Sequence, residues 1–134
     1  MTGEIRQRFA KAHALVGQID GLNVDQAAET IIHNCYYAMY HAAMAVLIAR
    51  SGTAPAKHSS LIGQFGLLVK SIGETERDAG RLLRSAFDLR LVADYEVEPS
   101  LMASEARRVL AATPKFLDLC ERLAQTMGNS ETAP

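Results

Sequence analysis

The chain has 134 residues, 49% of them hydrophobic and 22% charged, with a net charge of −1 at pH 7 and a pI near 6.4. This length fits one globular domain, which buries about two-thirds of the surface of its unfolded chain. The near-neutral charge excludes a general nucleic-acid coat, which needs a positive field to attract phosphates, but it leaves room for a local basic site.

Apolar spacing predicts three helices in the first half of the chain. Residues 4–19 carry apolar side chains at steps of three and four positions, and a turn follows. A long second helix is expected over residues 24–50. A third is expected over residues 58–71, with Gly73 as its C-terminal cap.

The second half of the chain predicts two more helices. The fourth is expected over residues 74–95; Pro99 then closes the connection, and Ser100 caps the fifth helix. Pro114 interrupts this last helix, either as a kink or as a fresh start with proline in the first turn. The tail, residues 128–134, is expected to fray.

These elements predict an all-α fold, a five-helix up-and-down bundle whose last helix is kinked or broken near Pro114. The sequence has no strand pattern and no internal repeat, so one helical domain is expected over residues 1–134. The N-terminus lacks the apolar run of a signal peptide, and we therefore expect a cytoplasmic protein.

Twenty consecutive residues of the second helix, 30–49, carry no formal charge. Histidine, asparagine and tyrosine side chains make this stretch unsuited to hydrocarbon, so we expect a helix buried in protein and no membrane span. One face carries small residues that permit close packing. The opposite face is aromatic with polar tips, and it is either further core or a subunit interface. The residues expected at a dimer interface are Tyr37, Tyr40 and His41.

No metal site and no cofactor are expected. His33 and His41 are two turns apart on the second helix, about 12 Å along its axis, which is too far for one ion. Cys35 and Cys120 stand among apolar helical positions, so both are expected to be buried, reduced thiols. The sequence also lacks a phosphate-cradling glycine loop and a nucleophile elbow.

The fourth helix has a charged residue where its apolar stripe should continue. Steps of three and four positions lead from Leu83 and Ala86 to Arg90, with Asp94 one turn later. A guanidinium directed inward must be paired and hydrogen-bonded, because an isolated buried charge is very costly. One interpretation is a structural ion pair between Arg90 and Asp94. The other is a polar pocket or dimer cleft in which Arg90 binds phosphate beside the Tyr95 ring.

The other side of this helix carries four charged residues, Arg77, Arg81, Arg84 and Asp88. One interpretation is a solvated face with a weak Arg84–Asp88 pair, since residues four apart are neighbours on a helix. The alternative is a strip that contacts phosphate.

Three segments match a known family pattern in order and spacing. Residues 34–43 read Asn-Cys-Tyr-Tyr-Ala-Met-Tyr-His-Ala-Ala, and the corresponding family segment resembles Arg-Ala-Tyr-Tyr-Ala-Met-Phe-His-Ala-Ala. Lys57-His58 is similar to a Lys-Thr-His before the third helix. Arg90 through Asp94-Tyr95 is similar to an Arg-x-x-x-Asp-Tyr run that ends the fourth. Together the segments resemble the HEPN superfamily, in its branch of small stand-alone prokaryotic proteins.

The resemblance implies a helical bundle that dimerises, often with a composite site at the two-fold axis. Active relatives of this kind are metal-independent endoribonucleases, and several are toxins partnered by a small nucleotidyltransferase antitoxin. Their motif is an arginine followed four to six residues later by a histidine. Arg90 matches the arginine, but Asp94, Tyr95 and Glu96 occupy the histidine window. Asn34 also replaces the arginine that usually precedes the tyrosine pair.

The missing histidine favours a binding protein with a degenerate ribonuclease motif, because RNA cleavage needs a base and an acid beside the stabilising arginine. We expect a homodimer that engages a nucleotide, RNA or a nucleotidyltransferase partner. The alternatives are an endoribonuclease toxin of a toxin–antitoxin pair, in which Arg90 is catalytic, and a structural dimerisation module without ligand. The residues expected to bind the ligand are Arg90, Asp94, Tyr95, His58 and His41.

Overall fold

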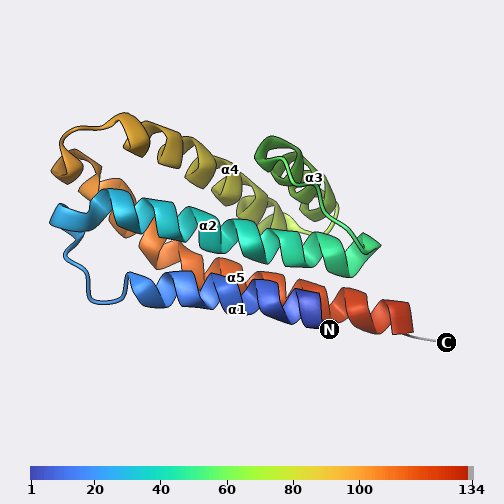
Figure 1. Ribbon diagram of the computed structural model, residues 1–134. Helices are drawn as coiled ribbons and strands as arrows, with labels where there is room; N and C mark the ends of the chain where they lie inside the picture. Colours follow the sequence, from blue (N-terminus) through green and yellow to red (C-terminus); the bar gives the residue numbers. More distant parts are fainter. Residues whose placement is uncertain (133–134) are drawn as a thin grey trace.

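The computed structural model describes residues 1–132, and every regular element in that range is a helix (Figure 1). The elements are α1 (Gly3–Gln18), α2 (Val24–Ser51), α3 (His58–Lys70), α4 (Glu74–Tyr95), the short 3-10 helix η1 (Pro99–Met102) and α5 (Ala103–Thr132). The predicted all-α fold is confirmed. The first four helices begin and end within one residue of their predicted limits.

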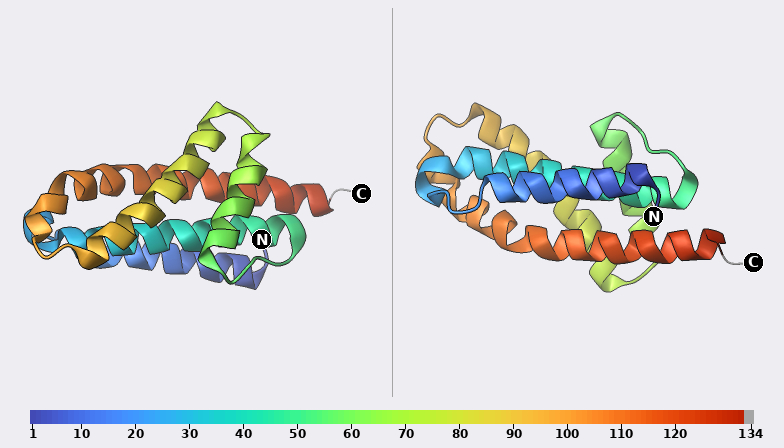
Figure 2. Two further views of the ribbon diagram at one scale, coloured as in Figure 1. Left: turned by 90° about the horizontal axis from the view of Figure 1, so that it is seen from above. Right: turned by 60° about the horizontal axis from the view of Figure 1, so that its bottom comes forward.

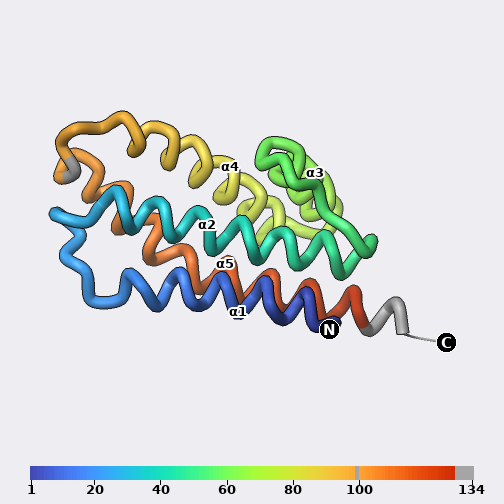
Figure 3. The backbone as a smooth tube through the Cα atoms, in the orientation of Figure 1, coloured from blue at the N-terminus to red at the C-terminus, as the bar shows by residue number. Residues whose placement is uncertain are grey.

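Three long helices, α1, α2 and α5, lie side by side along the length of the molecule (Figures 1 and 2). The hairpin of α3 and α4 lies across one side of them, and α4 runs obliquely over α2 and α5 (Figure 2, left). The backbone tube in Figure 3 follows the same path. α2 is central, because it packs against α1, α3, α4 and α5.

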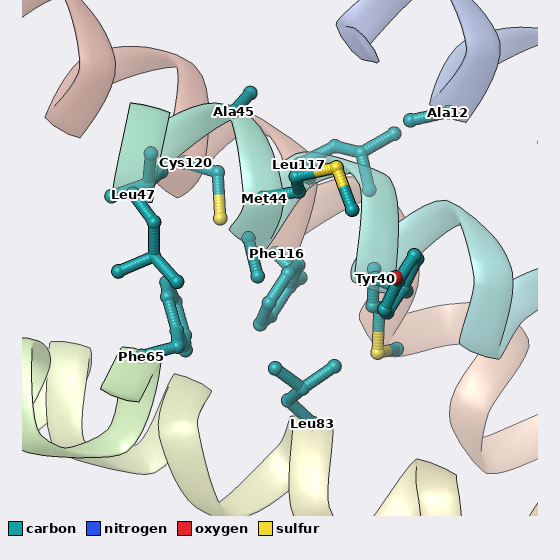
Figure 4. Close-up of a cluster of buried hydrophobic side chains, with 14 of the residues drawn as sticks. Ala12, Tyr40, Met44, Ala45, Leu47, Phe65, Leu83, Phe116, Leu117 and Cys120 are labelled. Carbon is teal, nitrogen blue, oxygen red and sulfur yellow. The ribbon is translucent and has the colours of Figure 1, made fainter. Parts of the chain in front are cut away.

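The small-residue face of α2 is buried as predicted. Alanines of that face at positions 28, 38, 42 and 43 are 0% exposed, so neighbouring helices approach α2 closely. In the centre of the core, Phe65 of α3, Leu83 of α4 and Phe116 of α5 gather around α2 (Figure 4). The Phe65 and Phe116 ring centroids are 5.6 Å apart. Each such side chain contributes about 1.5–3 kcal/mol through its burial. Cys35 and Cys120 are buried and free, as predicted.

Local signals fix the ends of α1 and α2. The Thr2 hydroxyl accepts a hydrogen bond from the Ile5 N–H at 3.4 Å, and the Asn23 side-chain oxygen accepts one from the Gln26 N–H at 3.1 Å. These caps satisfy N–H groups that have no partner within the helix. Gly52 ends α2 with a φ of 84°, a left-handed conformation that glycine adopts without strain.

The start of α5 differs from the prediction. Ser100 lies within η1, and α5 begins at Ala103, because the residues after Pro99 first form a tighter turn. α5 runs without a break through Pro114 and changes direction in its N-terminal part (Figure 1). α5 continues to Thr132, and the end of the tail that was expected to fray, residues 133–134, lies outside the described residues. None of the described helices combines the length and the apolar composition needed to cross a bilayer.

Candidate functional site

Arg90 lies on the core side of α4, as the helical spacing predicts. Its side chain is 18% exposed, and it follows Leu83 and Ala86 along a face that is otherwise buried and apolar. Three rings surround the guanidinium. The carbon Cζ lies 5.3 Å from the Tyr36 ring centroid, and 5.6 Å from those of Tyr37 and Phe87. Such cation–π contacts stabilise a partly desolvated cation by roughly 0.5–2 kcal/mol each.

The contact between Arg90 and Asp94 is long. The closest oxygen of Asp94 is 3.6 Å from Arg90 Nη1, and the Asp94 side chain is 41% exposed. This distance exceeds that of a hydrogen bond. Arg90 Nε is buried and has no partner within the described part of the chain. The terminal nitrogens Nη1 and Nη2 also make no hydrogen bond within the described part of the chain, so their donors are free for an acceptor such as a phosphate oxygen.

His58, the first residue of α3, joins the surroundings of Arg90. His58 Nδ1 and the Tyr36 hydroxyl share a hydrogen bond of 2.6 Å, and the imidazole stacks on the Tyr40 ring with 4.3 Å between centroids. Burial, and next the charge of Arg90, lower the pKa of His58. The imidazole is therefore neutral near pH 7. We name Arg90, Tyr36, Tyr37, His58 and Phe87 the Arg90 cluster.

Tyr36 is the buried centre of the Arg90 cluster. Its side chain is 0% exposed, and it contacts residues from both α3 and α4. Burial raises the pKa of the Tyr36 hydroxyl, although the charge of Arg90 opposes that shift. The hydroxyl consequently stays protonated and serves as a fixed hydrogen-bonding group for His58.

His41 contacts α1. Arg8 donates a hydrogen bond from Nη1 to His41 Nδ1 at 3.2 Å, and the rings of Tyr40 and His41 meet edge to face. Burial, followed by the charges of Arg8, Lys11 and His58, lowers the pKa of His41 to about 4. Of the two histidines considered from the sequence, the structure brings His58 into contact with the Arg90 cluster and gives His41 a separate arginine partner.

Tyr95 does not stack on Arg90. Its side chain is 86% exposed, and the rings against the guanidinium come from Tyr36, Tyr37 and Phe87 instead. The physical reason is helical geometry, because five residues turn Tyr95 by about 140° from Arg90 around the helix axis. Tyr95 is near Arg90 in the sequence, but the two residues do not lie on the same face of α4.

The aromatic face of α2 is partly core. Tyr40 is 7% exposed, and its hydroxyl donates to the Ala56 carbonyl at 3.3 Å, so its own chain already covers most of it. Tyr37 and His41 remain half-buried, and His33 is exposed. The rings of His33 and Tyr37 are 4.6 Å apart. Tyr37 therefore presents the open ring surface of the Arg90 cluster.

Sequence reasoning did not single out Tyr36 and Phe87 as site residues or Arg8 as the partner of His41. Tyr36 belongs to the quoted tyrosine pair, and Phe87 lies one turn before Arg90 on α4, so their positions carried a usable signal. Arg8 carried none, because its meeting with His41 depends on how α1 packs on α2. Asn34 is structural: its amide donates to the Leu15 carbonyl at 2.9 Å and to the Gln18 side chain at 3.1 Å.

The Arg90 cluster can hold a phosphate and a base together. The guanidinium supplies charge and donors for an anion, and the half-buried Tyr37 ring supplies a stacking surface. Neutral His58 adds a group that can accept or donate a proton. Within residues 1–132, no three His, Cys, Asp or Glu side chains converge to form a possible metal site.

Comparisons with known proteins give the following matches. The model of the HEPN domain family matches residues 22–123. The chain is 31% identical over 87 residues to a protein of Methanocaldococcus jannaschii that is named as a putative toxin; the match covers 65% of this chain and 63% of that protein. The chain thus spans less than two-thirds of that relative's length. It is 21% identical over 103 residues to a UPF0332 protein of Thermotoga maritima, covering 77% of each. No solved structure matched the chain significantly.

Proposed function

Since the chain belongs to the HEPN-domain family, we propose that it is a homodimeric binding protein that holds RNA at the Arg90 cluster. The observation that carries this proposal is the state of Arg90. Its guanidinium is 18% exposed and lies against three rings, yet it makes no hydrogen bond within the described residues. A cation held at this depth without hydrogen bonds fits a site whose acceptor is a ligand.

RNA fits the cluster better than a simple anion does. A phosphate alone would use the guanidinium, but it would leave the neighbouring Tyr37 ring without a role. A nucleotide supplies both a phosphate for Arg90 and a base for Tyr37, and base stacking on an aromatic ring contributes about 1–3 kcal/mol. RNA is favoured in particular because its single strands offer unstacked bases.

The proposed dimer forms through the open part of the α2 face, at His41 and one edge of Tyr37, and it leaves the Tyr37 ring face beside Arg90 open to the base. Both residues are half-buried and are flanked by Arg8 and Arg90. Tyrosine and arginine are enriched at subunit interfaces. A second copy at this face would bring two Arg90 clusters together into one cleft. A nucleotidyltransferase partner stays a prediction from the family resemblance.

RNA titration of Arg90→Ala tests the binding proposal. Fluorescence anisotropy of a labelled single-stranded RNA is expected to give a Kd for Arg90→Ala at least about tenfold higher than for the parent, since charge-assisted hydrogen bonds are strong. Arg50→Ala is the matched control, because Arg50 is an exposed arginine at the end of α2. Equal affinities for Arg90→Ala, Arg50→Ala and the parent would discard the proposal.

A second candidate is an endoribonuclease in which His58 takes the place of the histidine missing after Arg90. The specific observation is the 2.6 Å hydrogen bond that ties His58 to Tyr36, against whose ring Arg90 lies. When Nδ1–H donates to Tyr36, His58 Nε2 carries the free lone pair of a base. The relative named as a putative toxin also favours this candidate.

Cleavage at this site would follow a proton-transfer route. His58 Nε2 would take the proton of a ribose 2′-hydroxyl, whose oxygen attacks the adjacent phosphorus and expels the 5′-oxygen. The leaving 5′-oxygen would take a proton from water, and His58 would then release its own proton to solvent. Arg90 would stabilise the added negative charge on the phosphate oxygens. Incubation with end-labelled RNA should then yield 2′,3′-cyclic phosphate ends, which His58→Asn should lose. A parent protein that leaves structured RNA intact rules this candidate out.

A further inference from the structure

A groove runs between α3 and α4 and has a volume of about 700 Å³. Its walls come from the two helices of the hairpin seen in Figure 2. Four cations line it, Lys70 from α3 and Arg77, Arg81 and Arg84 from α4, together with the single carboxylate of Asp88. We name it the hairpin groove. Its local charge is positive, although the whole chain has a net charge of −1.

Most of these cations have no partner of their own. Arg81 pairs with Asp78 at 2.8 Å, but Lys70, Arg77 and Arg84 form no ion pair or side-chain hydrogen bond within residues 1–132. The Arg84–Asp88 pair, which belonged to one of the two interpretations of this face from the sequence, is also absent within residues 1–132. Lys70, Arg77 and Arg84 are exposed to solvent, and an anion placed among them would be attracted by several positive charges at once. The row is therefore suited to an external anion.

Glycines give the groove its depth. Gly63 and Gly66 of α3 and Gly80 of α4 line it, and a glycine inside a helix costs roughly 0.5–1 kcal/mol relative to alanine. Packing accounts for Gly80, because a Cβ there would lie 2.9 Å from Val69 Cγ2. Packing does not account for Gly63 and Gly66, whose Cβ atoms would meet nothing within 4 Å. These two glycines leave space in the groove that larger side chains would fill.

We propose that the hairpin groove binds the phosphodiester backbone of a single-stranded nucleic acid. The arginines at 77, 81 and 84 extend about 10 Å along α4, which exceeds the reach of one phosphate and suits a chain of them. A nucleic-acid duplex is wider than the space between two packed α-helices, whose axes lie about 8–10 Å apart, so a single strand fits the groove better. None of the lining residues is aromatic, so the groove reads phosphates and not bases.

This inference extends the proposed function by a second contact for the same strand, and its test is separate. Labelled oligouridylate and oligodeoxythymidylate are titrated at several salt concentrations against the parent and Arg77→Gln/Arg84→Gln. Each lost phosphate contact should reduce the slope of log K against log salt by about 0.7, and so by about 1.4 for the double variant. At 0.1 M salt each lost contact lowers affinity about fivefold, for both strands alike.

Two further variants complete the experiment. Gly63→Leu fills the groove without changing charge, and it should weaken binding while its circular dichroism spectrum stays unchanged. Arg6→Gln/Arg50→Gln removes two exposed arginines elsewhere and should leave the salt slope near the parent's. A double groove variant with the slope and affinity of this control overturns the inference.

The Arg90→Ala variant keeps the two proposals apart. If the groove variant weakens binding and Arg90→Ala does not, the proposal for the hairpin groove is supported and the proposal for the Arg90 cluster is rejected. If only Arg90→Ala loses affinity, the proposal for the Arg90 cluster is supported and the inference of binding in the hairpin groove is overturned. If both variants lose affinity, and a protein that carries both changes loses the sum of the two binding free energies, one strand contacts both sites.

Discussion

The guanidinium carbon of Arg90 lies 5.3 Å from the ring centroid of Tyr36, so a cation on α4 rests on a fully buried aromatic ring of α2. The hydroxyl of the same ring is hydrogen-bonded to His58 at the start of α3. Tyr36 thereby fixes the positions of a charge and a titratable group that come from different helices. The first two predictions concern this arrangement.

Arg90→Met should separate stability from binding. Replacing a poorly paired, largely buried cation with an apolar side chain is expected to leave the free energy of unfolding unchanged or to raise it by up to about 2 kcal/mol. RNA affinity should fall in the same variant. Urea denaturation followed by circular dichroism measures the first effect and anisotropy the second. A loss of about 3–5 kcal/mol would instead identify Arg90 and Asp94 as a structural ion pair.

Tyr36→Phe should destabilise the protein by about 1–2 kcal/mol, because it removes the hydrogen bond of 2.6 Å and leaves His58 without that partner. Tyr40→Phe is the matched control. Its hydroxyl bond to Ala56 is longer, at 3.3 Å, and water can replace it at that exposed loop, so the cost should stay below about 1 kcal/mol. Equal costs for the two variants would contradict the importance given to the Tyr36 hydroxyl.

Acidification should destabilise the protein through His41. Its pKa is lowered from 6.5 to about 4 by burial and by neighbouring charges, so between these values the unfolded chain binds more protons than the folded one. Stability is therefore full above pH 6.5 and is lost as pH falls toward 4, by at most about 3 kcal/mol from this group. His41→Gln, which keeps an acceptor for Arg8, should show a smaller loss. Denaturation curves at pH 7.5 and 4.5 provide the comparison.

Gly63→Ala and Gly80→Ala should change stability in opposite directions. At Gly63 the new methyl group meets nothing within 4 Å, so the helix gains about 0.5–1 kcal/mol. At Gly80 it meets Val69, which is 1% exposed and cannot move aside, so a loss of about 1–3 kcal/mol is expected. Thermal unfolding of both variants measures the two changes in stability. Stabilisation by Gly80→Ala would be inconsistent with this close crossing of α3 and α4.

Tyr37→Arg should convert the proposed dimer into a monomer. A new cation beside Arg90 and Arg8 places like charges across a two-fold contact, which costs several kcal/mol. Val97→Arg is the control, because Val97 is 88% exposed beyond the end of α4 and lies outside the proposed interface. Light scattering at micromolar concentration reads out the mass. A parent protein that is already monomeric would remove the dimer proposal.

Helical periodicity predicted the fold and the inward direction of Arg90, because both follow from steps along a single helix. Helical periodicity could not predict the contact between His58 and Tyr36. His58 lies across a loop from α2, and its position depends on how the α3–α4 hairpin packs against α2. Contacts between helices depend on side-chain fit, which no single stretch of sequence records.

Tyr40 and Tyr95 illustrate the same limit in different ways. An aromatic ring with a polar tip suits both a core and an interface, so composition left Tyr40 open, and only the packing of the loop at Ala56 decides its burial. Tyr95 was considered beside Arg90 because it is near in sequence. Whether Tyr95 can contact Arg90 depends on the angle between them around the axis of α4, and the short interval in sequence does not decide it.

The central place of α2, in contact with each of the other four α-helices, has a consequence for local opening. Residues 42–49 of α2 are all buried under at least one neighbour, so their amide protons reach solvent only when the whole assembly comes apart. Native-state hydrogen exchange at these amides should therefore report the global unfolding free energy, whereas amides at the outer ends of α1 and α3 should exchange through cheaper, partial openings.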